Sequence, residues 1–288
     1  MSKFKIAIIT DTDASLPLEL AEKHAIKQVP IIVLFGEESF RDVYEIDGET
    51  VFSRINKEGA LPTTSAPSPG QFSEAFQSAF DDGAEGILCI TVSSEVSATY
   101  AAAVTACEMY PGREIKVVDS RSVALGQGMM VLAAAEALAA GSSIDEAAAI
   151  AMDTGERIKL FAALPTLKYL AMSGRVGHLV AGVAGILSVR PILTIRDGKL
   201  DLLERVRTQK KSWARVVELC VESIGDRPIE RMSMIHITAP EDAKELESLL
   251  RAELDCPDEI MHVELNPGLA IHAGAGLVGA VFRAGKQI

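Results

Sequence analysis

The chain has 288 residues, 48% of them hydrophobic, and carries 28 Lys and Arg against 40 Asp and Glu, which gives a formal net charge of −12. Such a composition is typical of folded proteins and excludes disordered, collagen-like and fibrous chains, while the length predicts two domains. The acidic balance disfavours nucleic acid as a partner, because a surface that follows phosphates needs positive charge. The close basic run within residues 205–215 is typical of a solvated helix face.

The sequence predicts neither a membrane-spanning segment nor a signal peptide for export. The longest apolar stretch, residues 128–141, contains Glu136 and is shorter than the roughly 20 residues that a membrane span requires. The apolar run at the N-terminus stops at Asp11 without a signal-peptide cleavage site. The four cysteines form no CxxC pair, which favours reduced thiols in the cytoplasm over disulfides or a zinc site.

The first half of the chain alternates between strands and helices. Apolar, β-branched runs predict buried strands at 6–9, 28–34, 86–92 and 115–118, and helical periodicity predicts helices near 16–24, 48–58, 70–82, 96–109 and 122–140. This alternation predicts an α/β fold, with a mostly parallel sheet flanked by helices.

Hydroxyl-rich segments follow three of these strands, at 11–15, 93–99 and 119–122. In open parallel sheets, ligands bind beyond the carboxyl ends of the strands, so these segments are candidates for a binding site. Helix capping is the alternative explanation, because Ser, Thr and Asp are the preferred N-cap residues.

The segment 61–70 differs from an ordinary linker. Its three prolines restrict the backbone to an extended path that is neither helix nor central strand, and four hydroxyl residues lie between and beside them. It is either a stiff surface connector that leads into the next helix or a preorganised set of hydrogen-bond donors beside the sheet.

The second half predicts a further α/β domain with a mixed sheet. A strand at 160–164 precedes a helix, and strands at 191–195 and 200–206 form a hairpin around the turn at 196–199. A helix, strand, helix, strand pattern follows at 209–223, 232–238, 241–253 and 259–264. We therefore predict domains at 1–157 and 158–288.

The polar groups of these segments suit ligand binding better than catalysis. Motifs for nucleotide phosphates, zinc proteases and serine hydrolases do not occur, and the glycine pairs lack the third glycine of a dinucleotide site, so no cofactor or metal is predicted. Among the histidines, only His272 falls in a glycine-rich segment where a ligand can approach closely. Hydroxyls beside apolar walls suit a carrier that holds a carboxylate head and buries an apolar body. A serine acyl hydrolase acting on lipid esters and a module that binds sugars or phosphates remain alternatives.

An ordered set of segments resembles the DegV family of bacterial fatty-acid-binding proteins. The likeness runs from residue 4 to about 283 and rests on ITDTDASLP (9–17), PTTSAPSPGQF (62–72), SSEVSATY (93–100), VDS (118–120), SGRV (173–176), RPIL (190–193), DG (197–198), RVRTQKK (205–211) and HAGAG (272–276). The chain departs from the family pattern at Ala66, Ala98, Gly177 and Ala275, where Gln, Gly, Ser or Thr, and Pro are usual.

The resemblance implies a protein that is not itself an enzyme. It would bury a long-chain fatty acid in an apolar tunnel between its two domains and present the acid to the ATP-binding subunit of a fatty acid kinase. The resulting acyl phosphate would serve phospholipid synthesis in a bacterial cytoplasm, and transient contact with a membrane surface is compatible with this role. The positions that match the family's ligand-binding segments are Thr64, Ser65, Ser93, Ser94, Ser97, Arg175, Arg207, His272 and Gly274.

Overall fold

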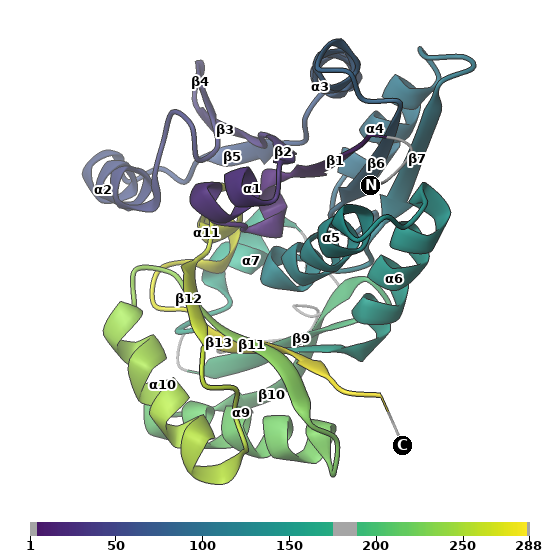
Figure 1. Ribbon diagram of the computed structural model, residues 1–288. Helices are drawn as coiled ribbons and strands as arrows, with labels where there is room; N and C mark the ends of the chain where they lie inside the picture. The colour runs from purple at the N-terminus through teal and green to yellow at the C-terminus, as the bar shows by residue number, and fades with distance from the viewer. Residues whose placement is uncertain (1–4, 175–188, 287–288) are drawn as a thin grey trace. The chain divides into compact units, whose positions relative to one another are not determined.

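The computed structural model describes residues 5–174 and 189–286, which pack as two compact units (Figure 1). Unit 1 comprises the chain up to Glu45 together with Thr64–Glu156, and unit 2 comprises Ile46–Thr63 together with the chain from Arg157. The predicted boundary after residue 157 places Ile46–Thr63 in the N-terminal domain, whereas these residues pack with the C-terminal part of the chain.

Unit 1 is built on a four-stranded parallel sheet with the strand order β2-β1-β6-β7. The strands are β1 (Ile6–Asp11), β2 (Ile26–Val29), β6 (Gly86–Thr91) and β7 (Glu114–Asp119). The register pairs Thr10 with Ile90 and Thr91 with Asp119, so β1, β6 and β7 end at the same edge of the sheet. The predicted parallel α/β fold is confirmed.

Helices cover both faces of this sheet (Figure 1). They are the 3-10 turn η1 (Thr12–Ala14), α1 (Leu18–Lys23), α3 (Pro69–Asp81), α4 (Thr99–Cys107), α5 (Ala124–Ala139) and α6 (Ile144–Arg157). Phe72 and Phe76 of α3 pack with Ile9 and Cys89 on one face. On the other face, α5 lies against Ile8 and is buried around its first three turns, which explains why its sequence is apolar on every side.

A small second sheet in the order β4-β3-β5 contains β3 (Ile32–Phe35), β4 (Glu38–Arg41) and β5 (Thr63–Ser65). The prediction of one strand over 28–34 is wrong, because β2 ends at Val29 and β3 begins at Ile32. Pro30 has no N–H for a strand ladder, and the Ile31 N–H donates instead to Thr12 Oγ1 over 3.0 Å.

Unit 2 holds a mixed six-stranded sheet in the order β10-β9-β8-β13-β11-β12. The strands are β8 (Ile158–Ala163), β9 (Arg190–Arg196), β10 (Lys199–Val206), β11 (Ile229–His236), β12 (Met261–Glu264) and β13 (Val278–Ala284). β9 and β10 form the predicted antiparallel hairpin, and β11 and β12 are parallel. The sequence patterns did not predict β13, which fills the middle of this sheet.

Among the described residues, the helices of unit 2 are α2 (Gly48–Glu58), α7 (Lys168–Ser173), α9 (Gln209–Ile224), α10 (Pro240–Glu253) and α11 (Pro267–Ala273). Trp213 and Val216 of α9 and Leu246 of α10 pack with Met234 and Phe282 in the core of the unit. α2 begins at the N-cap Asp47 and contacts α11, which is why residues 46–63 belong to this unit. Within residues 5–174 and 189–286, no helix has the length and apolar character needed to cross a bilayer.

Candidate functional site

Three polar loops meet at the carboxyl edge of the parallel sheet in unit 1. They follow β1, β6 and β7, and main-chain hydrogen bonds hold the second loop against the third. Ser93 N donates to Ser122 O over 2.9 Å, and Ser120 N donates to Thr91 O over 3.1 Å. The second and third loops are therefore joined, and they lie at the edge where ligands bind in sheets of this kind.

Asp11 connects the first of these loops to the second. Its Oδ2 accepts from Val92 N over 2.8 Å and from Gln127 Nε2 over 3.2 Å, and its Oδ1 accepts from Asp13 N over 3.0 Å. The side chain is fully buried, and the resulting loss of hydration raises its pKa to about 6 although these donors favour the charged form.

Sequence reasoning missed Asp11 and Gln127 as parts of this network. Asp11 was explicable as a helix cap, and it does cap η1. Gln127 Nε2 also donates to Thr10 Oγ1 over 2.9 Å. The signal in the sequence was an amide within the apolar first turns of a helix, because a buried amide needs hydrogen-bond partners.

The three candidate serines after β6 have different surroundings. Ser93 is buried, and its Oγ accepts from Glu95 N over 3.3 Å. Ser94 is exposed, and its hydroxyl donates to Asp119 Oδ2 over 2.5 Å. Ser97 Oγ lies 2.8 Å from Thr99 Oγ1 and accepts from Thr99 N. α4 begins at Thr99 and not at residue 96 as predicted, because residues 93–98 form the turn that positions these hydroxyls.

The candidates Thr64 and Ser65 lie on β5, within the proline-rich segment. Thr64 is half-buried, whereas Ser65 is exposed and donates from Oγ to Ala66 O over 3.1 Å. Ser68 caps α3 in a reciprocal box with Gln71, so its hydroxyl is used for capping. The segment therefore contains a short strand and leads into a helix, as a connector would, and its role as a set of donors for a ligand stays a prediction.

The remaining candidates belong to unit 2 or lie outside the described residues. Arg207 is exposed directly after β10, just before Thr208, the N-cap of α9. His272 is half-buried in the last turn of α11, so the glycine-rich segment is helical at this residue. Arg175 lies outside the described residues.

Gly274 holds a backbone conformation that few other residues adopt. Its φ is 84° and its ψ is 156°, and a Cβ built on it would lie 2.3 Å from Cδ2 of Tyr169 on α7. Glycine is therefore needed here for the close packing of α11 on α7. This packing role explains the residue independently of any ligand.

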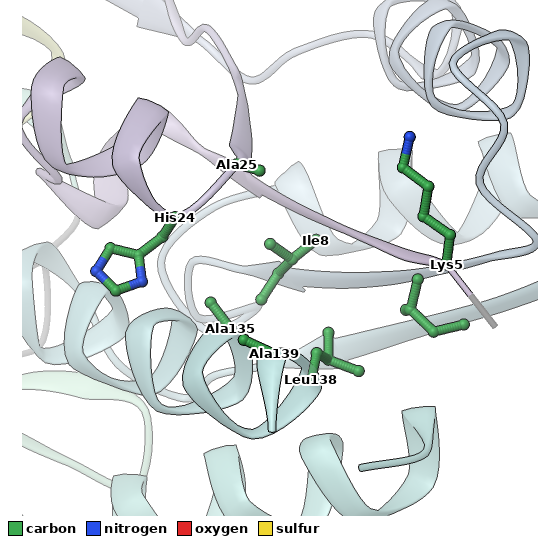
Figure 2. Close-up of a pocket in the computed structure, with 8 residues that line it drawn as sticks. Lys5, Ile8, His24, Ala25, Ala135, Leu138 and Ala139 are labelled. Carbon is green, nitrogen blue, oxygen red and sulfur yellow. The ribbon is translucent and has the colours of Figure 1, made fainter. Parts of the chain in front are cut away.

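A groove of about 370 Å³ lies at the opposite, amino-terminal end of β1. Figure 2 shows Lys5 and His24 at its two ends, with Ile8, Ala135 and Leu138 between them. The amine of Lys5 donates to Asp82 O over 2.7 Å, so it is already bonded within unit 1. The groove includes none of the candidate site residues.

The comparisons with known proteins agree with this fold. A family model described as an uncharacterised protein of the DegV family matches residues 5–285. A DegV domain-containing protein of Mycobacterium bovis, Mb2440c, is 36% identical over 285 residues, which cover 98% of each chain.

Two solved structures are also similar to the chain. The first is described as fatty acid binding of a DegV family protein from Thermus thermophilus. It has a TM-score of 0.90 and 28% identity, and the match covers 97% of this chain and 99% of that one. The second is DegV of Bacillus subtilis, which is described as a fatty acid binding protein. It has a TM-score of 0.88 and 27% identity, and the match covers 98% of this chain and 100% of that one.

The fold and the polar edge together define the class of two-unit α/β proteins in which polar loops follow the strands of a parallel sheet. Within that class, the chain belongs to the DegV family.

Proposed function

We propose that this protein binds a long-chain fatty acid, with the tail in an apolar tunnel and the carboxyl group among the hydroxyls of Thr64, Ser65, Ser93, Ser94 and Ser97. The observation that carries the proposal is the set of polar loops after β1, β6 and β7, which hydrogen bonds join to one another. Its hydroxyls and main-chain N–H groups suit a small polar head group. Similar proteins from Thermus thermophilus and Bacillus subtilis are described as binding fatty acids, which supports the choice of ligand.

We further propose that the bound acid is presented to a separate ATP-binding kinase subunit, which forms the acyl phosphate. Arg175, Arg207, His272 and Gly274 are the candidates for the head-group side of this reaction. Arg207 supports the assignment because its exposed guanidinium is suited to an anionic phosphate.

A binding role is favoured over the alternative of a serine acyl hydrolase. The segments 11–15, 92–99 and 119–122 contain no histidine, and the hydroxyl of Ser94 donates to a carboxylate and not to an imidazole. A serine nucleophile needs a base that removes its proton at neutral pH, and an aspartate alone is a weak one.

The test is native mass spectrometry of the purified protein, followed by thermal unfolding of delipidated protein with oleate. We expect a bound acid at one molecule per chain and a melting temperature that rises with oleate concentration, because a ligand that binds only the folded state stabilises it. A phosphorylated sugar and a chromogenic acyl ester serve as controls. Stabilisation by the sugar alone, or ester turnover that one serine substitution abolishes, would contradict the proposal.

A further inference from the structure

The hydroxyl of Ser94 already donates a hydrogen bond within the protein, to the carboxylate of Asp119. Besides the 2.5 Å hydrogen bond from Ser94 Oγ to Asp119 Oδ2, Ser94 N donates to Asp119 Oδ1 over 3.1 Å, and Arg121 N donates to the same oxygen over 2.9 Å. Asp119 ends β7 and is half-buried, and its neighbour in the register is Thr91 at the end of β6. The carboxylate therefore fixes both the main chain and the hydroxyl of Ser94.

A serine hydroxyl has one proton and two lone pairs. Because the proton of Ser94 points to Asp119, the exposed side of its oxygen offers lone pairs only. A ligand carboxylate also offers only lone pairs, so the two groups cannot form a hydrogen bond while Ser94 keeps its bond to Asp119. A protonated carboxyl group has the missing donor. Ser65 is in a similar state, since its hydroxyl donates to Ala66 O.

The charges around these loops also disfavour a second carboxylate. Asp119 and Glu95 are both acidic side chains of these loops, and Arg121 faces Glu95 with 4.0 Å between Arg121 Nη1 and Glu95 Oε1. The buried Asp11 lies behind the same loop, bonded to Val92 N. Where two carboxyl groups share a site, one of them tends to keep its proton, because two like charges at close range are unfavourable.

We propose that the polar edge of unit 1 binds the fatty acid in its protonated form, with the acid O–H donating to Ser94 Oγ and with Asp119 as the residue that positions Ser94 to accept. The inference rests on the proposed function and names the state of the ligand that the site selects. A free fatty acid is ionised at neutral pH, so its binding takes up one proton from solvent. No bond other than this O–H bond is made or broken. Asp119 acts through Ser94 and is therefore a positioning residue.

The experiment uses the delipidated full-length chain and decanoic acid. Calorimetric titrations at pH 7.5 in two buffers of different ionisation enthalpy measure the protons taken up per ligand bound. For the unmodified protein we expect an uptake of about one proton per ligand bound. We also expect its affinity for the acid to fall about tenfold per pH unit above pH 7. Asp119→Asn allows the Ser94 hydroxyl to accept from the amide and to donate to the ligand, so proton uptake should fall close to zero. Asp145→Asn, at an exposed ion pair with Lys116, is the matched control and should keep the uptake.

A second measurement needs no substitution. The carboxyl ¹³C resonance of bound [1-¹³C]decanoic acid should stay at the position of the neutral acid at pH 7.5. It reports on the ligand itself and so separates this proton from that of Asp11, whose pKa of about 6 lies nearby. A carboxylate resonance, or equal proton uptake in Asp119→Asn, would overturn the inference and leave the proposed function standing. Absence of saturable binding would overturn the proposed function and this inference with it.

Discussion

Val92 N donates to Asp11 Oδ2 over 2.8 Å, and this hydrogen bond joins the end of β6 to the end of β1. Asp11 is 0% exposed, so its carboxyl group supports the Ser93 loop from inside the unit. The position of the candidate head-group serines thus depends on a titratable group that a ligand does not reach.

The pKa of Asp11 predicts how stability changes with pH. The folded-state value of about 6 lies above the ordinary value of 3.8, so the folded state binds the proton more tightly than the unfolded state. The stabilisation by neutral Asp11 is complete below about pH 3.8 and is lost as the pH rises through about 6. The loss amounts to about 3 kcal/mol at most, from a shift of about two units.

Urea unfolding at several pH values between 4 and 8 measures this contribution. Asp11→Asn provides the comparison, because the amide does not titrate and the other groups contribute equally to both curves. We expect the stability of the unmodified protein to fall relative to that of the variant between pH 4 and 7. Parallel curves would show that Asp11 does not titrate in this range.

Thr64→Val tests the candidate hydroxyl on β5. The substitution keeps the shape and removes the hydroxyl, so we expect fatty acid affinity to fall by about 1–3 kcal/mol, the cost of leaving a polar ligand atom unpaired. Thr63→Val is the control, because Thr63 is the exposed neighbour on the same strand. Equilibrium binding of decanoic acid gives both values. Equal affinities in the two variants would remove Thr64 from the site.

Arg207→Ala separates presentation of the ligand from its binding. Arg207 is exposed at the end of β10, so we expect its loss to slow acyl phosphate formation with the kinase subunit by tenfold or more while acid binding changes less than twofold. Arg196→Ala, at an ion pair with Asp201 within the same hairpin, is the control. If binding and phosphorylation fall together, Arg207 has a structural role.

Gly274→Ala is predicted to destabilise unit 2. The new Cβ would meet the ring of Tyr169, and the φ of 84° disfavours any side chain. We expect a loss of more than about 2 kcal/mol, against about 1 kcal/mol for Gly59→Ala. Gly59 also has a positive φ, of 69°, but has open space around it. Thermal unfolding compares the two, and equal losses would mean that Tyr169 moves aside without cost.

Much of the fold followed from local patterns in the sequence. The helix that periodicity predicted near 48–58 has the bounds of α2, and Asp47 and Gly59 cap its two ends. The hairpin of β9 and β10 was predicted from two strand-like runs on either side of its Asp-Gly turn. In contrast, β13 and α11 were missed, since the C-terminal glycines and small residues give no clear period.

The sequence by itself determined the parallel α/β class, the hydroxyl-rich loops after the strands and the likeness to fatty-acid-binding proteins, because periodicity and local spacing reside in neighbouring residues. Only the tertiary structure decided that Ile46–Thr63 packs in unit 2, that Asp11 is buried beneath the Ser93 loop and that Ser94 donates to Asp119. Those facts depend on strand register and on burial between segments far apart in the chain. The hydroxyl of Ser94 can donate to or accept from a ligand, and Asp119, at the end of the neighbouring strand, selects between the two.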